Sequence, residues 1–138
     1  MGVIKQATIK NTRQLAEANK ADDTVTTLGE ILDLTAGLAV AATSSSTRAT
    51  ILGVCNETIA AADAKTRVSY IVPSDEDTFI FPTTNNSDAT HNGQDMILGA
   101  DSSTINNTGT TSAVGVVRQV EPYGAAADKL IIGKFITV

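Results

Sequence analysis

The chain has 138 residues, a net charge of −5 from ten basic and fifteen acidic residues, 42% hydrophobic residues and no tryptophan. A chain of this length forms one domain with a sizeable core and needs no disulfides or metals to do so. Its basic residues are scattered singly and its aromatic residues are few, which argues against nucleic-acid binding. No stretch approaches the roughly 20 apolar residues of a membrane helix, so we expect no membrane contact.

The first 27 residues differ in pattern from the rest and are interpreted as an N-terminal arm. Residues 11–20 are the only plausible helix, because Asn11 or Thr12 is a suitable cap and Leu15 favours helix. A helix this short is marginal in water, so the segment either docks on another surface or is extended. We therefore divide the chain into an arm at 1–27 and a single β-rich domain at 28–138.

From Leu28 onward, short apolar strands alternate with turns. The hairpin signal is GEILDLTAGLAVAAT, which predicts two strands around a turn at Ala36-Gly37. Further strands are predicted in TRATILGVC, TRVSYIV, DTFIFPT, DMILG, SAVGVVRQV and KLIIGKFITV. Their spacing predicts a mainly β fold: a small β-barrel or β-sandwich with an N-terminal arm and at most one or two short helices.

The strand patterns also predict local geometry. Glycines within the apolar runs predict bulges or tight bends at Gly53, Gly115 and Gly133. In the polar run at 99–112, Ile105 is the one sizeable apolar side chain, and we expect it to tuck back onto the domain as a short strand. Alternation predicts that three sets each share one face: Phe79 with Phe81; Val114, Val116 and Val120; and Leu130, Ile132, Ile136 and Val138.

Residues with catalytic or metal-binding chemistry are sparse and isolated. His91, the only histidine, lies in a polar loop without an obvious partner, and Cys55 ends an apolar run, as a buried free thiol does. Asp22-Asp23 and Asp75-Glu76-Asp77 lack the spacing of a calcium loop, and the second is interpreted as a turn between two strands. We predict a protein that is not an enzyme and has no cofactor and no metal.

Two stretches carry a family resemblance, GEILDLTAGLAVAATSSSTRATILGVCNET and GQDMILGADSSTINNTGTTSAVGVVRQVEPYGAAADKLIIGKFITV. In the composition and order of its strands and turns, the chain resembles small decoration, or cement, proteins of tailed-phage heads. The resemblance covers most of the chain after Leu28. It implies a virion protein that binds the major capsid protein on the shell exterior as a homo-oligomer, with a trimer as the expected form, and reinforces the shell. We expect it to be made in the host cytoplasm. Its acidic charge suits an outer surface because packaged DNA would repel it.

The arm is then expected to contact the shell or an adjacent copy. Its apolar anchors would be Val3, Ile4, Ile9 and Leu15, and its basic contacts would be Lys5, Lys10 and Arg13. The alternative, a first strand and helix packed on their own domain, stays open.

Two other functions stay open as well. One is a β-sandwich binding module of a fibre or adhesin that recognises a glycan or host surface. Tyr123, at a turn, is the best candidate aromatic for it, and Tyr70 is interpreted as core. The other is a different phage structural part, such as a tail or head-completion protein.

Overall fold

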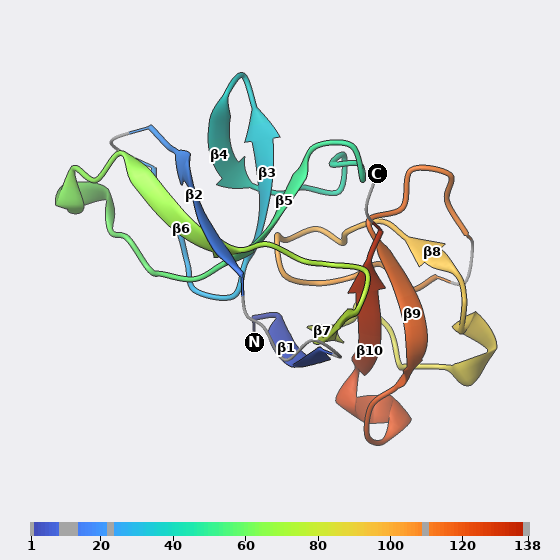
Figure 1. The fold of residues 1–138 in the computed structure, drawn as a ribbon. Coiled ribbons are helices and arrows are strands. Elements are labelled where there is room, and N and C mark those ends of the chain that lie inside the picture. Colours follow the sequence, from blue (N-terminus) through green and yellow to red (C-terminus); the bar gives the residue numbers. More distant parts are fainter. Residues whose placement is uncertain (1, 9–13, 22–23, 109–110, 137–138) are drawn as a thin grey trace.

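A computed structural model describes residues 2–8, 14–21, 24–108 and 111–136. It contains two five-stranded antiparallel sheets side by side (Figure 1). Sheet A has the order β1 (Ile4–Thr8), β7 (Asp77–Pro82), β10 (Leu130–Phe135), β9 (Val117–Pro122) and β8 (Asp95–Met96). Sheet B has the order β2 (Leu15–Asn19), β6 (Arg67–Ile71), β5 (Ile51–Cys55), β3 (Ile31–Thr35) and β4 (Leu38–Ala41). The predicted mainly β fold is confirmed, as a small sandwich rather than a closed barrel.

Helical structure in the described residues is limited to three single 3-10 turns. They are η1 (Ala61–Asp63), η2 (Ala89–His91) and η3 (Ala126–Asp128). The predicted helix at residues 11–20 is wrong where it is described, because Leu15–Asn19 forms β2 and pairs with β6; residues 11–13 lie outside the described residues. Cross-strand hydrogen bonding along a whole strand outweighs the weak helix preference of so short a segment.

The β3–β4 hairpin forms where the sequence predicts it. Ala36 and Gly37 have φ values of 52° and 80°, which is the left-handed conformation that a two-residue type I′ turn requires at both positions. Thr35 pairs with Leu38 directly beside the turn. The hairpin extends away from the rest of sheet B (Figure 1).

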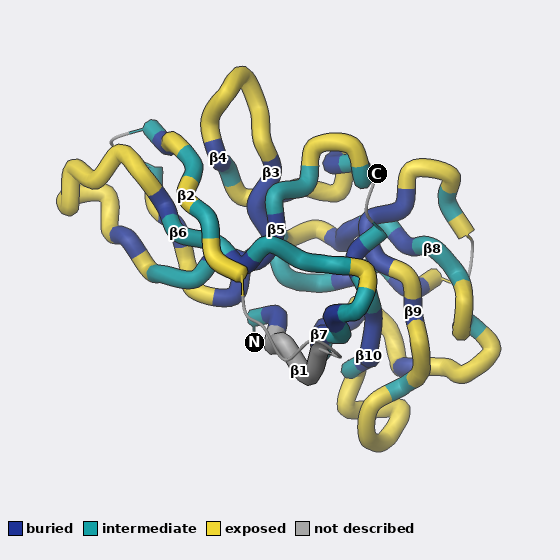
Figure 2. The backbone as a smooth tube through the Cα atoms, in the orientation of Figure 1, coloured by how far each residue is buried: buried dark blue, intermediate teal, exposed yellow. Residues whose placement is uncertain are grey.

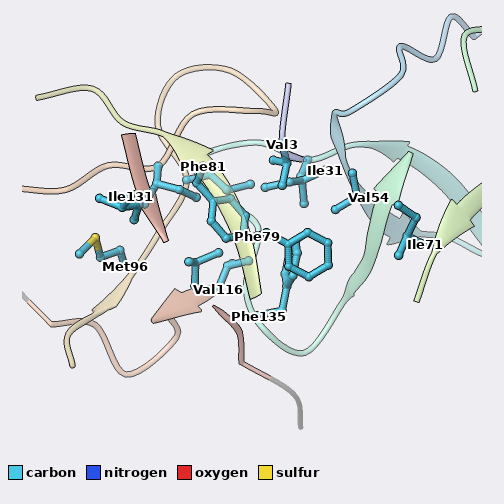
Figure 3. Packing of buried hydrophobic residues seen from close by; sticks show 14 residues of the cluster. Val3, Ile31, Val54, Ile71, Phe79, Phe81, Met96, Val116, Ile131 and Phe135 are labelled. Atoms are coloured by element: carbon cyan, nitrogen blue, oxygen red, sulfur yellow. The ribbon is translucent and has the colours of Figure 1, made fainter. Parts of the chain in front are cut away.

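The main core lies between the two sheets (Figure 3). Sheet A contributes Phe79, Phe81 and Phe135, whose ring centroids are 5.2–6.0 Å apart. Sheet B contributes Ile31, Val54 and Ile71. The predicted shared face of Phe79 and Phe81 is confirmed, since neither is exposed. Figure 2 shows this buried zone running through the middle of the molecule.

A second, smaller cluster lies on the other face of sheet B. It consists of Leu32, Ala39, Cys55, Ile59 and Val68. Sheet B curls around this cluster, and its two edge strands, β2 and β4, approach one another. Sheet B therefore buries side chains on both faces.

Two of the three predicted glycine irregularities coincide with bulges. The β3–β5 register shifts beside Gly53, and a Cβ there would lie 2.1 Å from the carbonyl oxygen of Ile71. The β9–β10 register shifts between Ile132 and Gly133. Gly115 instead precedes β9, where its lack of a side chain lets the backbone of Asp95 pass closely.

The face predicted for Val114, Val116 and Val120 is wrong. Val116 is buried, whereas Val114 and Val120 are 48% and 40% exposed. Alternation fails because β9 begins only at Val117, after a turn that includes Gly115. In β10 it is the odd-numbered Ile131 and Phe135 that belong to the main core, rather than the predicted even-numbered set. Ile136 of that set follows the strand, and Val138 lies outside the described residues.

The polar run at 99–112 is anchored by its one large apolar side chain. Ile105 is fully buried and forms single bridges with Thr83 and Leu98. Its N–H donates to the carbonyl of Pro82 at 2.8 Å. The prediction that Ile105 tucks back onto the domain is confirmed, with a bridge in place of a short strand.

Candidate interaction surface

The structure separates the residues predicted to contact a partner. Val3 is buried in the main core, and its N–H donates to the carbonyl of Gly29 at 2.8 Å, so its side chain serves the protein's own fold. Ile4 and Lys5 belong to β1, an edge strand of sheet A, whereas Leu15 is 49% exposed on β2, an edge strand of sheet B.

Three further members of the predicted set, Ile9, Lys10 and Arg13, lie outside the described residues. A contact role for the rest of the segment stays a prediction. Burial is described for Val3 and Leu15, and of these two Leu15 is the exposed one.

Cys55 and His91 lie on different elements, Cys55 on β5 and His91 on the η2 turn. The Cys55 thiol is buried and donates to the carbonyl of Glu57 at 3.0 Å; burial raises its pKa, which keeps it protonated and unreactive. His91 closes the η2 turn. Across the ranges that the structure describes, no group of three or more His, Cys, Asp or Glu residues is arranged to hold a metal, and no helix has the length and hydrophobicity to cross a membrane.

The acidic run at 75–77 forms part of the turn between β6 and β7. Asp77 is buried, and its Oδ2 accepts a hydrogen bond from the N–H of Ser74 at 3.0 Å. Its own N–H donates to the carbonyl of Ser74 at 3.1 Å. The interpretation of this run as an inter-strand turn is confirmed, although Asp77 is buried rather than solvated.

The tip of the β3–β4 hairpin is an exposed, uncharged surface. All five residues from Leu34 to Leu38 are exposed (Figure 2), and the two leucines expose 41% and 36% of their surface. The sequence shows leucines flanking an Ala-Gly turn, and that signal predicts the hairpin. It does not reveal that the tip extends beyond the neighbouring strands.

An arginine-aspartate cluster joins the two sheets at one end. Arg48, on the connection between β4 and β5, donates through Nε to the carbonyl of Gly115 at 3.0 Å and through Nη2 to Asp95 at 3.3 Å. Arg118 on β9 donates to the same carboxylate at 2.7 and 3.2 Å. The hydrogen bonds from Arg118 hold the pKa of Asp95 below its ordinary value, with a smaller contribution from Arg48. The sequence pattern does not predict this cluster, because its members come from three segments that are distant along the chain.

A groove lies beside this cluster and consists of two adjoining hollows that share Phe135 and Ile136. One hollow, of about 400 Å³, is also lined by Asp75, Arg118 and Lys134. The other, of about 250 Å³, is lined by apolar residue types apart from a single cation. Its further lining residues are Arg48, Ala49, Ile51, Leu52, Val72 and Pro73. We call the two hollows together the junction groove.

The hairpin tip and the junction groove are thus two features of the described surface with chemistry suited to contact. The chain matches no known protein family and no curated protein. The properties of these two surfaces must therefore be derived from their own residues.

Proposed function

We propose that this protein is a structural component of a virion that binds the outer surface of a phage shell as a homo-oligomer and stabilises it. The observation that carries the proposal is the hairpin tip, which presents Leu34 and Leu38 without a charged neighbour between them. Apolar side chains held on a protruding, well-defined turn are suited to a neighbouring protein surface. The resemblance to cement proteins and the net charge of −5 support the same function.

The hairpin geometry supplies a physical route to stabilisation. Its two-residue turn and paired flanks fix the backbone that carries the leucines before binding, so little backbone entropy is lost on contact. A protein that binds the assembled shell better than its separated subunits shifts the equilibrium toward the assembled state. Contact alone, without chemistry, is sufficient for this role.

A co-sedimentation experiment tests the proposal. The wild-type protein is mixed with shells of the tailed phage that encodes it, alongside the double variant Leu34→Ser/Leu38→Ser. We expect the wild type to sediment with shells and the double variant to bind about 100-fold more weakly, because two apolar contacts are lost. The matched control is Val114→Ser/Val120→Ser, which changes two similarly exposed side chains, one before β9 and one within it, and keeps binding.

Imaging of the same particles separates the shell from other virion locations. Density on the outer shell surface supports decoration, and density inside the tail or at the head-completion site refutes it. Mass measurement of the protein with and without shells tests the expected trimer. A wild-type protein that stays in the supernatant overturns the proposal.

One observation favours a second function, glycan recognition by a fibre or adhesin. Tyr123, at the turn after β9, is 41% exposed, whereas Tyr70 packs against the sheet B cluster. An exposed aromatic ring is a suitable platform for a sugar. A glycan array probed with the wild type and Tyr123→Ala tests this function: selective binding that the variant loses supports it, and no binding by the folded wild type refutes it.

A further inference from the structure

The junction groove contains a like-charge pair held in register by the sheet. Arg118 on β9 and Lys134 on β10 are directly opposite one another. Like charges at such positions disfavour the pairing unless an anion compensates them. Asp95 lies opposite Arg118 on its other side, in β8, and binds its guanidinium. Within the described part of the chain, Lys134 makes no ion pair.

The groove around this pair offers two kinds of contact. Arg118 and Lys134 line the larger hollow, whose wall also carries one carboxylate, Asp75. Phe135 and Ile136 continue into the smaller hollow, where all the lining residues except Arg48 are of apolar types. A ligand that fits the whole groove therefore combines negative charge at one end with apolar groups at the other.

The distribution of charge makes this groove unusual on an acidic protein. The structure describes the side chains of seven lysines and arginines, and three of them, Arg48, Arg118 and Lys134, line the groove. Two others, Lys65 and Arg67, are paired with glutamates elsewhere. Arg48 and Arg118 share the carboxylate of Asp95, and Asp75 also lines the groove. Three cations against two carboxylates leave one net positive charge there, on a chain that carries −5 as a whole.

We propose that the junction groove binds an extended acidic segment of a partner protein. One carboxylate of the segment lies between Arg118 and Lys134, and a neighbouring apolar side chain packs over Phe135 and Ile136. The apolar half of the groove favours a peptide over a free anion, because a small anion leaves that half uncovered. The chemistry of this binding site is the same whether or not the partner is a shell protein.

The test uses the full chain and a fluorescein-labelled peptide of eight alternating Asp and Leu residues, followed by anisotropy at low salt. We expect the peptide to bind the wild type and to bind Lys134→Glu about tenfold or more weakly, because a charge-assisted contact becomes a repulsion. The matched control is Lys129→Glu, which makes the same charge change on the exposed turn after η3 and keeps wild-type binding. Raising the salt should weaken binding to the wild type.

Two further arms distinguish the alternatives. A peptide with Lys in place of Asp should not bind, and free acetate should compete only at far higher concentration than the unlabelled acidic peptide. Backbone NMR shifts on adding the acidic peptide should include Ile51, Lys134 and Phe135, which covers both hollows without any substitution. The hairpin variant Leu34→Ser/Leu38→Ser should bind the peptide like the wild type, so failure of shell binding and failure of this inference are separate results.

Several outcomes overturn the inference. They are a wild type that does not bind the acidic peptide, equal binding by wild type and Lys134→Glu, equal binding of the lysine peptide, and NMR shifts confined to residues outside the groove. Displacement of the peptide by acetate at similar concentration also overturns it, because the site would then recognise a simple anion.

Discussion

Sheet A and sheet B have the same number of strands but bury very different interiors. All three phenylalanines of the chain lie in the core between the sheets, and all three come from strands of sheet A. The fully buried part of the cluster that sheet B encloses alone contains aliphatic residues and the thiol of Cys55, and no aromatic ring. Because aromatic side chains bury the largest apolar areas, the shared core supplies most of the packing free energy. Sheet B depends on it through Ile31, Val54 and Ile71.

The largest expected effect comes from removing an aromatic ring from the shared core. Phe79→Ala should lower the free energy of unfolding by about 3–5 kcal/mol, through lost burial and the cavity left behind. Val68→Ala, in the sheet B cluster, should cost about 2 kcal/mol, since fewer methyl groups are removed. Denaturant unfolding measures both values. Equal losses would show that the sheet B cluster contributes as much as the shared core.

The next effect concerns the two bulge glycines, one in each sheet. Gly53→Ala places a Cβ 2.1 Å from a backbone oxygen at a φ of 153°, and should cost about 3 kcal/mol because backbone must move. Gly133→Ala meets a side-chain methyl of Val117 at 2.8 Å, which can shift, and the backbone oxygen of Arg118 only at 3.1 Å, and should cost about 1–2 kcal/mol. Unfolding curves that reverse this order would contradict the bulge geometry of sheet B.

A smaller effect is expected at Asp95, whose carboxylate binds Arg48, on the β4–β5 connection of sheet B, and Arg118, on β9 of sheet A. Asp95→Asn should lower the free energy of unfolding by about 1 kcal/mol, because it weakens charge-assisted hydrogen bonds from Arg118 and Arg48 that are partly exposed to solvent. The measurement is denaturant unfolding at neutral pH. A control at Asp128→Asn changes the same group on the η3 turn, away from the cluster.

The same variant gives a pH dependence with a defined sign. The folded-state pKa of Asp95 is lowered, so its stabilisation is complete above the unfolded-state pKa, near 4, and is lost as the pH falls through the folded-state value. The stability difference between wild type and Asp95→Asn should therefore be constant above about pH 5 and shrink below about pH 4. A difference that grows with acid would contradict the assigned ion pairs.

The last test changes no residue and measures whether sheet B unfolds separately from sheet A. Cys55 is the only cysteine and lies in the sheet B cluster, so its reaction with a disulfide reagent reports exposure of that cluster. We expect labelling to require the same free energy as global unfolding, because the shared core ties the sheets together. The labelling rate of the denatured protein provides the reference. Labelling at a much lower free energy would show that sheet B unfolds independently.

Much of the fold could be predicted from the sequence because the relevant signals are local. The Ala36-Gly37 turn needs positive φ at two adjacent residues, and alternation in 77–82 marks Phe79 and Phe81 as one face. Residues 15–19 lacked such a signal: alanines and a glutamate suit a helix, and only pairing with β6 makes them a strand. The contact surfaces were less predictable still. The sequence predicted that the N-terminal segment contacts a partner, whereas the structure buries Val3 of that segment in the core.

By itself, the sequence determined the class of the fold, the position of the exposed hairpin and the burial of Cys55, since each depends on neighbours along the chain. The tertiary structure decided which strands form which sheet, and therefore which charges meet. Arg48, Asp95 and Arg118 come from separate segments, and Lys134 reaches Arg118 only through the register of β9 and β10. Register depends on packing across the whole sheet, because a shift of one residue moves every side chain to the opposite face.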